Sequence, residues 1–177
     1  MERTILGLRV ECVEGDIARQ VGFEAVVNAA NRELLPGGGV AGAIHRAAGP
    51  ALAEACRPLA PIRPGEAVLT PGFLLPNPWV VHCLGPVYGR DLPSDALLRR
   101  CYESILALAE RNGIASLATP ALSTGVFGYP LAEAAEVALG TVAAAAPGLT
   151  RLRRVRFVLW GDRAREAHER VLARLVG

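Results

Sequence analysis

Two glycine-rich loops, each joining a strand-like segment to a helix-like one, constrain the fold of this chain most strongly. The first covers residues 36–42 (PGGGVAG) and the second residues 123–128 (STGVFG). In that position, backbone N–H groups and the positive end of a helix can bind a phosphate without a lysine. Two such loops predict a diphosphate held from both sides. The alternative is that the glycines only make tight turns.

Strand-like and helix-like segments alternate along the whole chain, which is typical of an α/β layer protein. The patterns predict strands over residues 8–14, 25–27, 66–70, 79–84, 116–118 and 153–160. Helices are predicted over 43–48, 51–56, 94–111, 130–146 and from 162 onward, with Ser94 and Asp162 as N-caps. A chain of 177 residues, 51% of them apolar, suits a single domain over 1–177. We therefore expect one mixed sheet between helices.

Composition excludes several classes of site. The chain has 19 basic residues and every one is arginine, so no site that depends on a phosphate-binding or Schiff-base lysine can exist. A net charge of +2 is too balanced to indicate an electrostatic nucleic-acid partner. With three histidines and no CxxC pair, neither a metal centre nor another cofactor is expected.

The cysteines and the hydropathy pattern bear on location. No apolar stretch follows the first four residues, and no run approaches 18 apolar residues. Neither a secretory signal nor a membrane span is therefore predicted. The four scattered cysteines are predicted to be buried, reduced thiols of a cytoplasmic protein. They are Cys12, Cys56, Cys83 and Cys101.

Gly37, Gly39 and Gly42 match the GxGxxG pattern, so a nicotinamide dinucleotide site has to be considered. That motif directly follows its strand, whereas here Gly37 lies ten positions after Val27. The pattern also expects an acidic residue about 20 positions further on, at the end of the next strand. Glu66 instead begins a predicted strand. We conclude that the GxGxxG match does not indicate a nicotinamide dinucleotide site.

Asn28 and Asn31 lie between a predicted strand and the first glycine loop. Each amide offers a donor and an acceptor, which suits the adjacent hydroxyls of a ribose. A neutral amide cannot act as a general base, so the pair would position a sugar or a water. The alternative is that both are turn residues that bind their own backbone.

Three further features have both a functional and a purely structural interpretation. Asp16 is an N-cap by default, or a carboxylate that accepts from an adenine amine. Trp160 stacks on a base or fills the core. The arginines around residues 151–156 predict a solvated strand entrance, with a nucleic-acid patch as the minor alternative. They are Arg151, Arg153, Arg154 and Arg156.

Taken together, the motifs resemble the macrodomain family. The similarity runs in order through residues 13–17 (VEGDI), 26–31 (VVNAAN), 37–45 (GGGVAGAIH), 81–88 (VHCLGPVY) and 120–130 (PALSTGVFGYP). It implies an α/β fold, a three-layer α/β/α sandwich with a mixed, roughly six-stranded central sheet. It also implies binding of ADP-ribose.

The resemblance assigns roles to individual residues. Asp16 would accept from the adenine amine, the Ile17 N–H would face the adenine ring, and Trp160 would pack near it. Asn28 and Asn31 would meet the distal ribose, with Asn31 at the usual catalytic position and Asn28 also counted as catalytic. His45 would support the site without acting as a nucleophile. Gly38, Gly39 and Val40 would line one side of the diphosphate, with Gly39 also counted as catalytic, and Ser123, Thr124, Gly125, Val126 and Phe127 the other.

The chain is most similar to the branch that removes ADP-ribose from acidic side chains of proteins and deacetylates O-acetyl-ADP-ribose. It departs from many members at Pro36, where a glycine is frequent, and at Ala41, where an aspartate is frequent. Without that carboxylate, the substrate's own phosphate would serve as the base. A non-catalytic reader of ADP-ribose is the main alternative, and an ADP-ribose phosphatase a weaker one. Expected partners are ADP-ribose, O-acetyl-ADP-ribose and ADP-ribosylated proteins.

Overall fold

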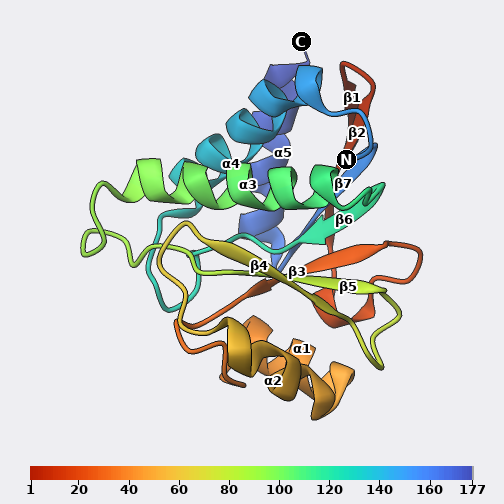
Figure 1. The fold of residues 1–177 in the computed structure, drawn as a ribbon. Helices are drawn as coiled ribbons and strands as arrows, with labels where there is room; N and C mark the ends of the chain where they lie inside the picture. Colours follow the sequence, from red (N-terminus) through yellow and green to blue (C-terminus); the bar gives the residue numbers. More distant parts are fainter. Residues whose placement is uncertain (177) are drawn as a thin grey trace.

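A seven-stranded mixed sheet lies at the centre of the computed structural model, which describes residues 1–176 (Figure 1). The strand order is β1-β2-β7-β6-β3-β5-β4. The five inner strands run parallel, and β1 and β4 pair antiparallel at the two edges. The strands are β1 Glu2–Ile5, β2 Leu8–Glu14, β3 Ala25–Ala29, β4 Ala67–Pro71, β5 Trp79–Cys83, β6 Ser116–Thr119 and β7 Arg154–Leu159.

Helices cover both faces of the sheet (Figure 1). On one face lie α1 Gly39–Ala48 and α2 Ala51–Cys56, and on the other lie α3 Ser94–Arg111, α4 Leu131–Ala145 and α5 Asp162–Leu175. Short 3₁₀ helices cover Ile17–Arg19, Arg57–Leu59 and Ala146–Gly148. The predicted three-layer α/β/α sandwich is confirmed. None of the helices within residues 1–176 combines the length and apolar character that a membrane span requires.

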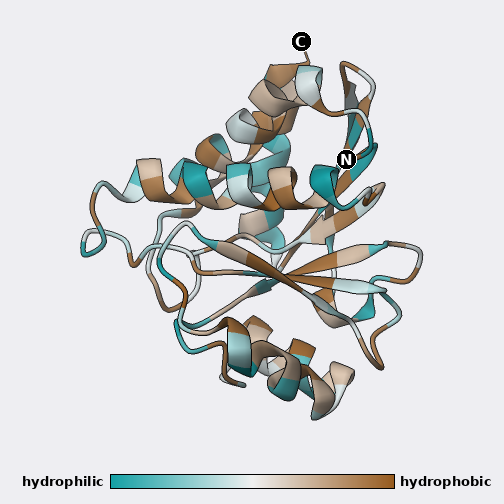
Figure 2. Ribbon diagram, viewed as in Figure 1, coloured by the Kyte–Doolittle hydropathy of each residue, from teal (hydrophilic) through white to brown (hydrophobic). Residues whose placement is uncertain are grey.

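The two helical layers pack on two separate apolar clusters, as the central strand β3 illustrates. Ala25 and Val27 belong to the cluster under α3, α4 and α5, and Val26 belongs to the cluster over α1 and α2. A strand buried on both faces reads as a near-continuous apolar run, since alternate side chains point to opposite faces. Figure 2 shows hydrophobic residues on the central strands and hydrophobic and hydrophilic residues alternating along the helices. All four cysteines are buried and unpaired, as predicted.

The sheet has one strand more than the roughly six expected. The additional strand is β1, which pairs antiparallel with β2. Three of its four residues are exposed. A short, polar edge strand carries no hydrophobic alternation, so its sequence gives no strand signal.

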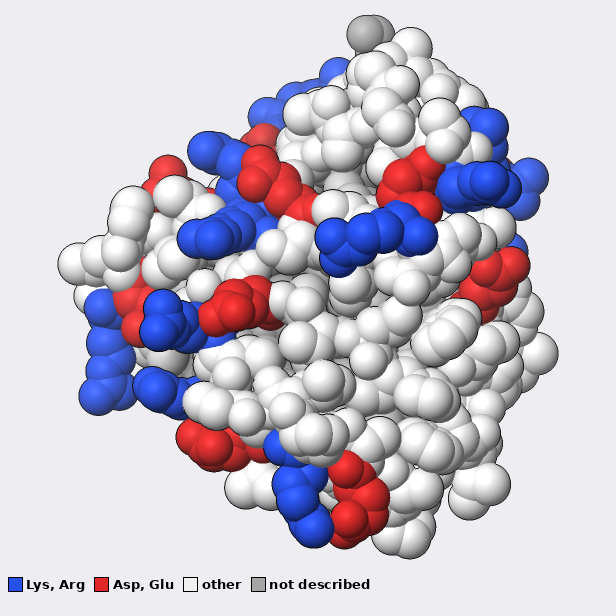
Figure 3. Space-filling model, viewed as in Figure 1, with Lys and Arg blue, Asp and Glu red and all other residues white. Residues whose placement is uncertain are grey.

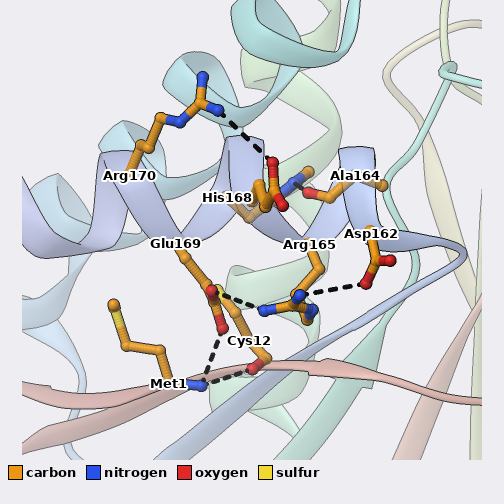
Figure 4. Close-up of polar contacts among 9 residues, drawn as sticks. Met1, Cys12, Asp162, Ala164, Arg165, His168, Glu169 and Arg170 are labelled. Atoms are coloured by element: carbon orange, nitrogen blue, oxygen red, sulfur yellow. Dashed lines mark hydrogen bonds and ion pairs between the residues drawn. The ribbon is translucent and has the colours of Figure 1, made fainter.

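The N-terminus holds β1 against the helical layer. The ammonium group of Met1 donates to the Cys12 carbonyl oxygen (2.9 Å) and to Glu169 Oε1 on α5 (3.2 Å). Arg165 binds the other carboxylate oxygen of Glu169 and also Asp162, as Figure 4 shows. This network ties the first strand to the last helix.

Two predicted N-caps are wrong by one position. Ser94 and Asp162 are the first residues of α3 and α5, and the caps are Pro93 and Gly161. Gly161 has φ +85°, which only glycine adopts readily. Ser94 instead stabilises the preceding turn, where its hydroxyl donates to the Asp91 carbonyl (2.7 Å) and accepts from the Gly89 N–H (3.1 Å).

The arginine cluster is solvated only in part. Arg151 and Arg153 are exposed, as predicted. Arg154 and Arg156 both bind Glu11, a buried carboxylate on β2, and their guanidinium groups lie 4.4 and 4.5 Å from the Phe23 ring centroid. Burial raises the pKa of Glu11, but hydrogen bonds from the two arginines lower it below its ordinary value. Figure 3 shows basic and acidic side chains interspersed on one face of the molecule.

Candidate functional site

The predicted site residues lie at one edge of the sheet. Five neighbouring strands are parallel, so their carboxyl ends point the same way. β2 leads to Asp16, β7 to Trp160, β6 to the second glycine loop, and β3 to Asn31 and the first glycine loop. Ligands of open α/β sheets bind outside this carboxyl edge.

These segments pack on one apolar cluster of the core. Its buried members include Ile17, Ala30, Leu34 and Leu84, and the partly buried side chains of Val40 and Phe127 pack against it. The same cluster therefore packs against the turn after β2, the loops after β3 and β5, and both glycine loops. The tertiary structure brings together segments that are more than 100 residues apart in the chain.

The first glycine loop ends in the first turn of α1. Gly38 is the N-cap and Gly39 begins the helix with φ +54°. The helix is thus four residues longer than the predicted 43–48. Gly38 and Gly39 are exposed, and the first N–H groups of a helix have no partner within the helix. A side chain at Gly42 would overlap the Gly37 carbonyl oxygen, which explains the small residue there.

The second glycine loop is held tightly despite its exposed tip. Ser123 has φ +66° and is buried, and its Oγ has no hydrogen-bond partner among residues 1–176. The Tyr129 N–H donates to the Ser123 carbonyl (2.9 Å), and the Tyr88 N–H donates to the Phe127 carbonyl (2.9 Å). Val126 is fully exposed at the tip. A residue other than glycine in the left-handed region is strained, and such strained residues occur often at functional sites.

The remaining residues of that loop are open to solvent to different degrees. Thr124 is partly buried, and its hydroxyl donates to the Ala121 carbonyl (2.8 Å). Gly125 is exposed, and its carbonyl accepts from the Gly128 N–H (3.0 Å). Gly85, after β5, has no room for a side chain, because a Cβ there would clash with Ser123 Oγ.

Asn28 is buried and oriented by a histidine that the sequence argument did not use. Its Nδ2 lies 3.0 Å from His82 Nδ1, and His82 Nε2 lies 2.9 Å from Thr70 Oγ1. Asn28 Oδ1 has no partner within the described residues. The self-bonding alternative is therefore wrong for Asn28.

Asn31 makes the contacts that the self-bonding alternative describes. Its Nδ2 donates to the Leu35 carbonyl (2.7 Å), and its Oδ1 accepts from the Leu35 N–H (2.9 Å). The amide therefore closes the turn that leads into the first glycine loop. A Cβ at Gly37 would lie 3.4 Å from Asn31 Nδ2, so the side chain also borders the loop itself.

Asp16 is an N-cap, and its carboxylate remains accessible. Oδ1 accepts from the Ala18 N–H (2.9 Å), Oδ2 lies 3.6 Å from Arg19 Nε, and the side chain is 47% exposed. Ile17 beside it is buried. Trp160 is 87% exposed at the end of β7, so the interpretation as a core residue is wrong.

His45 lies on α1, with its ring centroid 6.5 Å from that of His82. Both ring nitrogens are buried and have no hydrogen-bond partner among residues 1–176, and burial lowers the pKa of the imidazole. It lines a cavity of about 220 Å³ beside the first glycine loop, together with Pro36, Gly37, Gly42, Arg46, Gly49, Pro50 and Ala53. No group of three His, Cys, Asp or Glu residues in the described chain could hold a metal ion.

Sequence reasoning gave no role to His82, Thr70 and Gly85. His82 stands in an apolar strand (WVVHC), and a polar residue inside such a run is the signal that could have drawn attention to it. Its pairing with Asn28 and Thr70 could not be found this way, because these two residues come from β3 and β4.

The sequence profile described as Macro domain matches residues 27–138. The chain belongs to the macro domain family. Among curated relatives, the O-acetyl-ADP-ribose deacetylase of Salmonella gallinarum is 44% identical over 169 residues, 93% of this chain and 94% of the relative. A macro domain-containing protein of Ralstonia nicotianae is 52% identical over 120 residues, 67% of this chain and 70% of the relative.

Solved macro domain structures share the whole fold. The Oceanobacillus iheyensis macrodomain with ADP superposes with a TM-score of 0.94 at 36% identity, covering 99% of this chain and 96% of that one. The Trypanosoma brucei macrodomain in complex with ADP-ribose gives a TM-score of 0.86 at 38% identity, covering 92% and 68%. The predicted family and fold class are confirmed.

Proposed function

We propose that this macro domain binds ADP-ribose along the carboxyl edge and hydrolyses esters of it. The substrates are O-acetyl-ADP-ribose and ADP-ribose attached to carboxylate side chains of proteins. The observation that carries the proposal is that both glycine loops pack on one apolar cluster, and that β3, the strand before the first loop, carries a buried amide oxygen, Asn28 Oδ1, with no hydrogen-bond partner in residues 1–176. The relative named O-acetyl-ADP-ribose deacetylase supports the reaction class.

The ligand spans the edge from β2 to β3. Asp16 accepts from the adenine amine through its accessible carboxylate, beside the Ile17 N–H, and Trp160 presents an exposed ring for stacking. The N–H groups of Gly38, Gly39 and Val40 bind the diphosphate at the start of a ten-residue helix. The backbone of the second glycine loop, residues 123–127, closes over the other side.

Water is the nucleophile and the diphosphate is the base. Asn28 and Asn31 are amides and Ala41 is apolar and buried, so none of the three can take a proton. For the acetyl ester, water adds to the carbonyl carbon while a diphosphate oxygen takes its proton. The bond between the carbonyl carbon and the ribose oxygen then breaks, and this oxygen takes the proton back from the diphosphate, which gives acetic acid and ADP-ribose. Asn31 aligns the water once it exchanges its bonds to Leu35 for bonds to the substrate.

A non-catalytic reader of ADP-ribose is the second candidate, and the buried Ala41 favours it, because position 41 brings no carboxylate to the site. Incubation of the purified chain with O-acetyl-ADP-ribose and with a carboxyl-linked mono-ADP-ribosylated protein separates the two. We expect free ADP-ribose from both. Binding of ADP-ribose in calorimetry with no release of product would establish the reader, and absence of binding would refute both functions.

A further inference from the structure

We propose that His82 is a positioning residue that fixes the amide of Asn28 with its oxygen toward the ligand. This inference rests on the proposed ADP-ribose binding. The fixed Asn28 oxygen makes the distal end of the site specific for a ligand that has a hydroxyl group there. Asn28 then accepts a hydrogen bond from a hydroxyl of the distal ribose, and a ligand without a donor at that point leaves the oxygen unpaired.

A chain of directed hydrogen bonds supports the assignment. The Thr70 hydroxyl donates to the Pro71 carbonyl (3.1 Å), so its oxygen is free to accept from His82 Nε2–H at 2.9 Å. With the proton on Nε2, His82 Nδ1 holds a lone pair. That lone pair accepts from Asn28 Nδ2 at 3.0 Å.

The surroundings keep His82 neutral, so one ring nitrogen remains an acceptor, and the contact to Thr70 assigns that role to Nδ1. The side chain is fully buried, and burial together with His45 lowers the pKa of His82 to about 3. The thiol of Cys56 also lies beside the ring, with Sγ 3.6 Å from Nε2 and 4.0 Å from Nδ1, and burial raises its pKa to about 11. An imidazolium here would present N–H to Asn28 and turn the amide around.

This orientation of the amide leaves the Asn28 oxygen as an unpaired acceptor. Asn28 is only 1% exposed, and Oδ1 has no hydrogen-bond partner within residues 1–176. A buried acceptor left unpaired costs free energy, so a hydroxyl that reaches it gains that amount on binding. If the amide rotated, an N–H group would stand there instead and would disfavour a donor.

Two substitutions of similar size separate positioning from structural support. In His82→Asn, the amide oxygen takes the place of Nδ1 and keeps an acceptor for Asn28. In His82→Gln, the amide reaches the place of Nε2 and keeps the contact to Thr70, but Asn28 loses its acceptor. Loss of one directing hydrogen bond should weaken ADP-ribose binding about tenfold in His82→Gln, and His82→Asn should restore most of it.

ADP is the matched control ligand, because it lacks the distal ribose. We expect calorimetry to give unchanged ADP affinity in both variants. Equal ADP-ribose affinities of the two variants, or an equal loss for ADP, would overturn the inference. So would ¹⁵N NMR of wild-type His82 that finds the proton on Nδ1, a result that does not depend on either variant folding. If wild-type protein binds ADP but not ADP-ribose, the proposed function fails, while the NMR result still decides the orientation of Asn28.

Discussion

Gly85→Ala tests whether the second glycine loop is part of the site. A Cβ at position 85 would lie 3.4 Å from the Ser123 Cβ and 3.5 Å from its backbone nitrogen, which are ordinary contacts. Its distance to Ser123 Oγ, however, falls well below the 3.0 Å that real Cβ contacts respect. Ser123 is buried, so packing around its side chain opposes rotation of the hydroxyl away from the new methyl group. We therefore expect the overlap to displace the second glycine loop.

The size of the effect follows from this overlap. A shift of the loop on the order of 1 Å should weaken ADP-ribose binding and lower the rate of ester hydrolysis about 100-fold, since misplaced binding groups lose that much. Overpacking should lower the free energy of unfolding by about 1–3 kcal/mol. Calorimetry with ADP-ribose, an assay for ADP-ribose formed from O-acetyl-ADP-ribose, and thermal unfolding measure the three effects.

A second substitution should reverse the first. Ser123→Ala removes the hydroxyl that meets the new methyl group, so the double variant Gly85→Ala/Ser123→Ala should regain most of the lost affinity and rate. Gly140→Ala is the matched control, because Gly140 lies within α4 and no atom of residues 1–176 outside the neighbouring residues of that helix comes within 4 Å of its Cβ position. It should leave both unchanged and raise the unfolding free energy by about 0.5–1 kcal/mol. Normal binding by Gly85→Ala would refute the argument, as would a double variant no better than the single one.

Three further outcomes are expected. Asp16→Ala should weaken ADP-ribose binding and, because the cap is lost, lower the unfolding free energy by about 1 kcal/mol; unchanged affinity in calorimetry would remove Asp16 from the adenine site. Asn31→Ala should slow hydrolysis on the order of 100-fold while ADP-ribose binding falls far less, and full activity in a product assay would make Asn31 a loop clamp alone. Glu110 accepts bonds from the Thr150 hydroxyl and three backbone N–H groups, which lower its pKa from 4.5 to about 2. Its stabilisation is therefore complete above pH 4.5 and is lost as the pH falls toward 2; Glu110→Gln should flatten acid unfolding curves over that range.

Much of the fold follows from local pattern. β3 is apolar at positions 25–27 because both faces of the strand are covered, and α2 occupies the predicted residues 51–56. The glycine loops follow β3 and β6 as expected. Where the pattern failed, as at β1, the residues are polar and exposed, and only pairing with β2 makes them a strand.

In the candidate site, too, local sequence pattern accounts for some features and tertiary contacts for others. The sequence by itself determined which segments carry glycines, amides and the carboxylate of Asp16, because these are local features of composition and spacing. Only the tertiary structure decided what each amide does. Asn28 and Asn31 are the same residue type three positions apart, yet Asn28 meets His82 from a neighbouring strand and Asn31 meets Leu35 four residues ahead. A hydrogen bond across strands depends on sheet register, which no local pattern records.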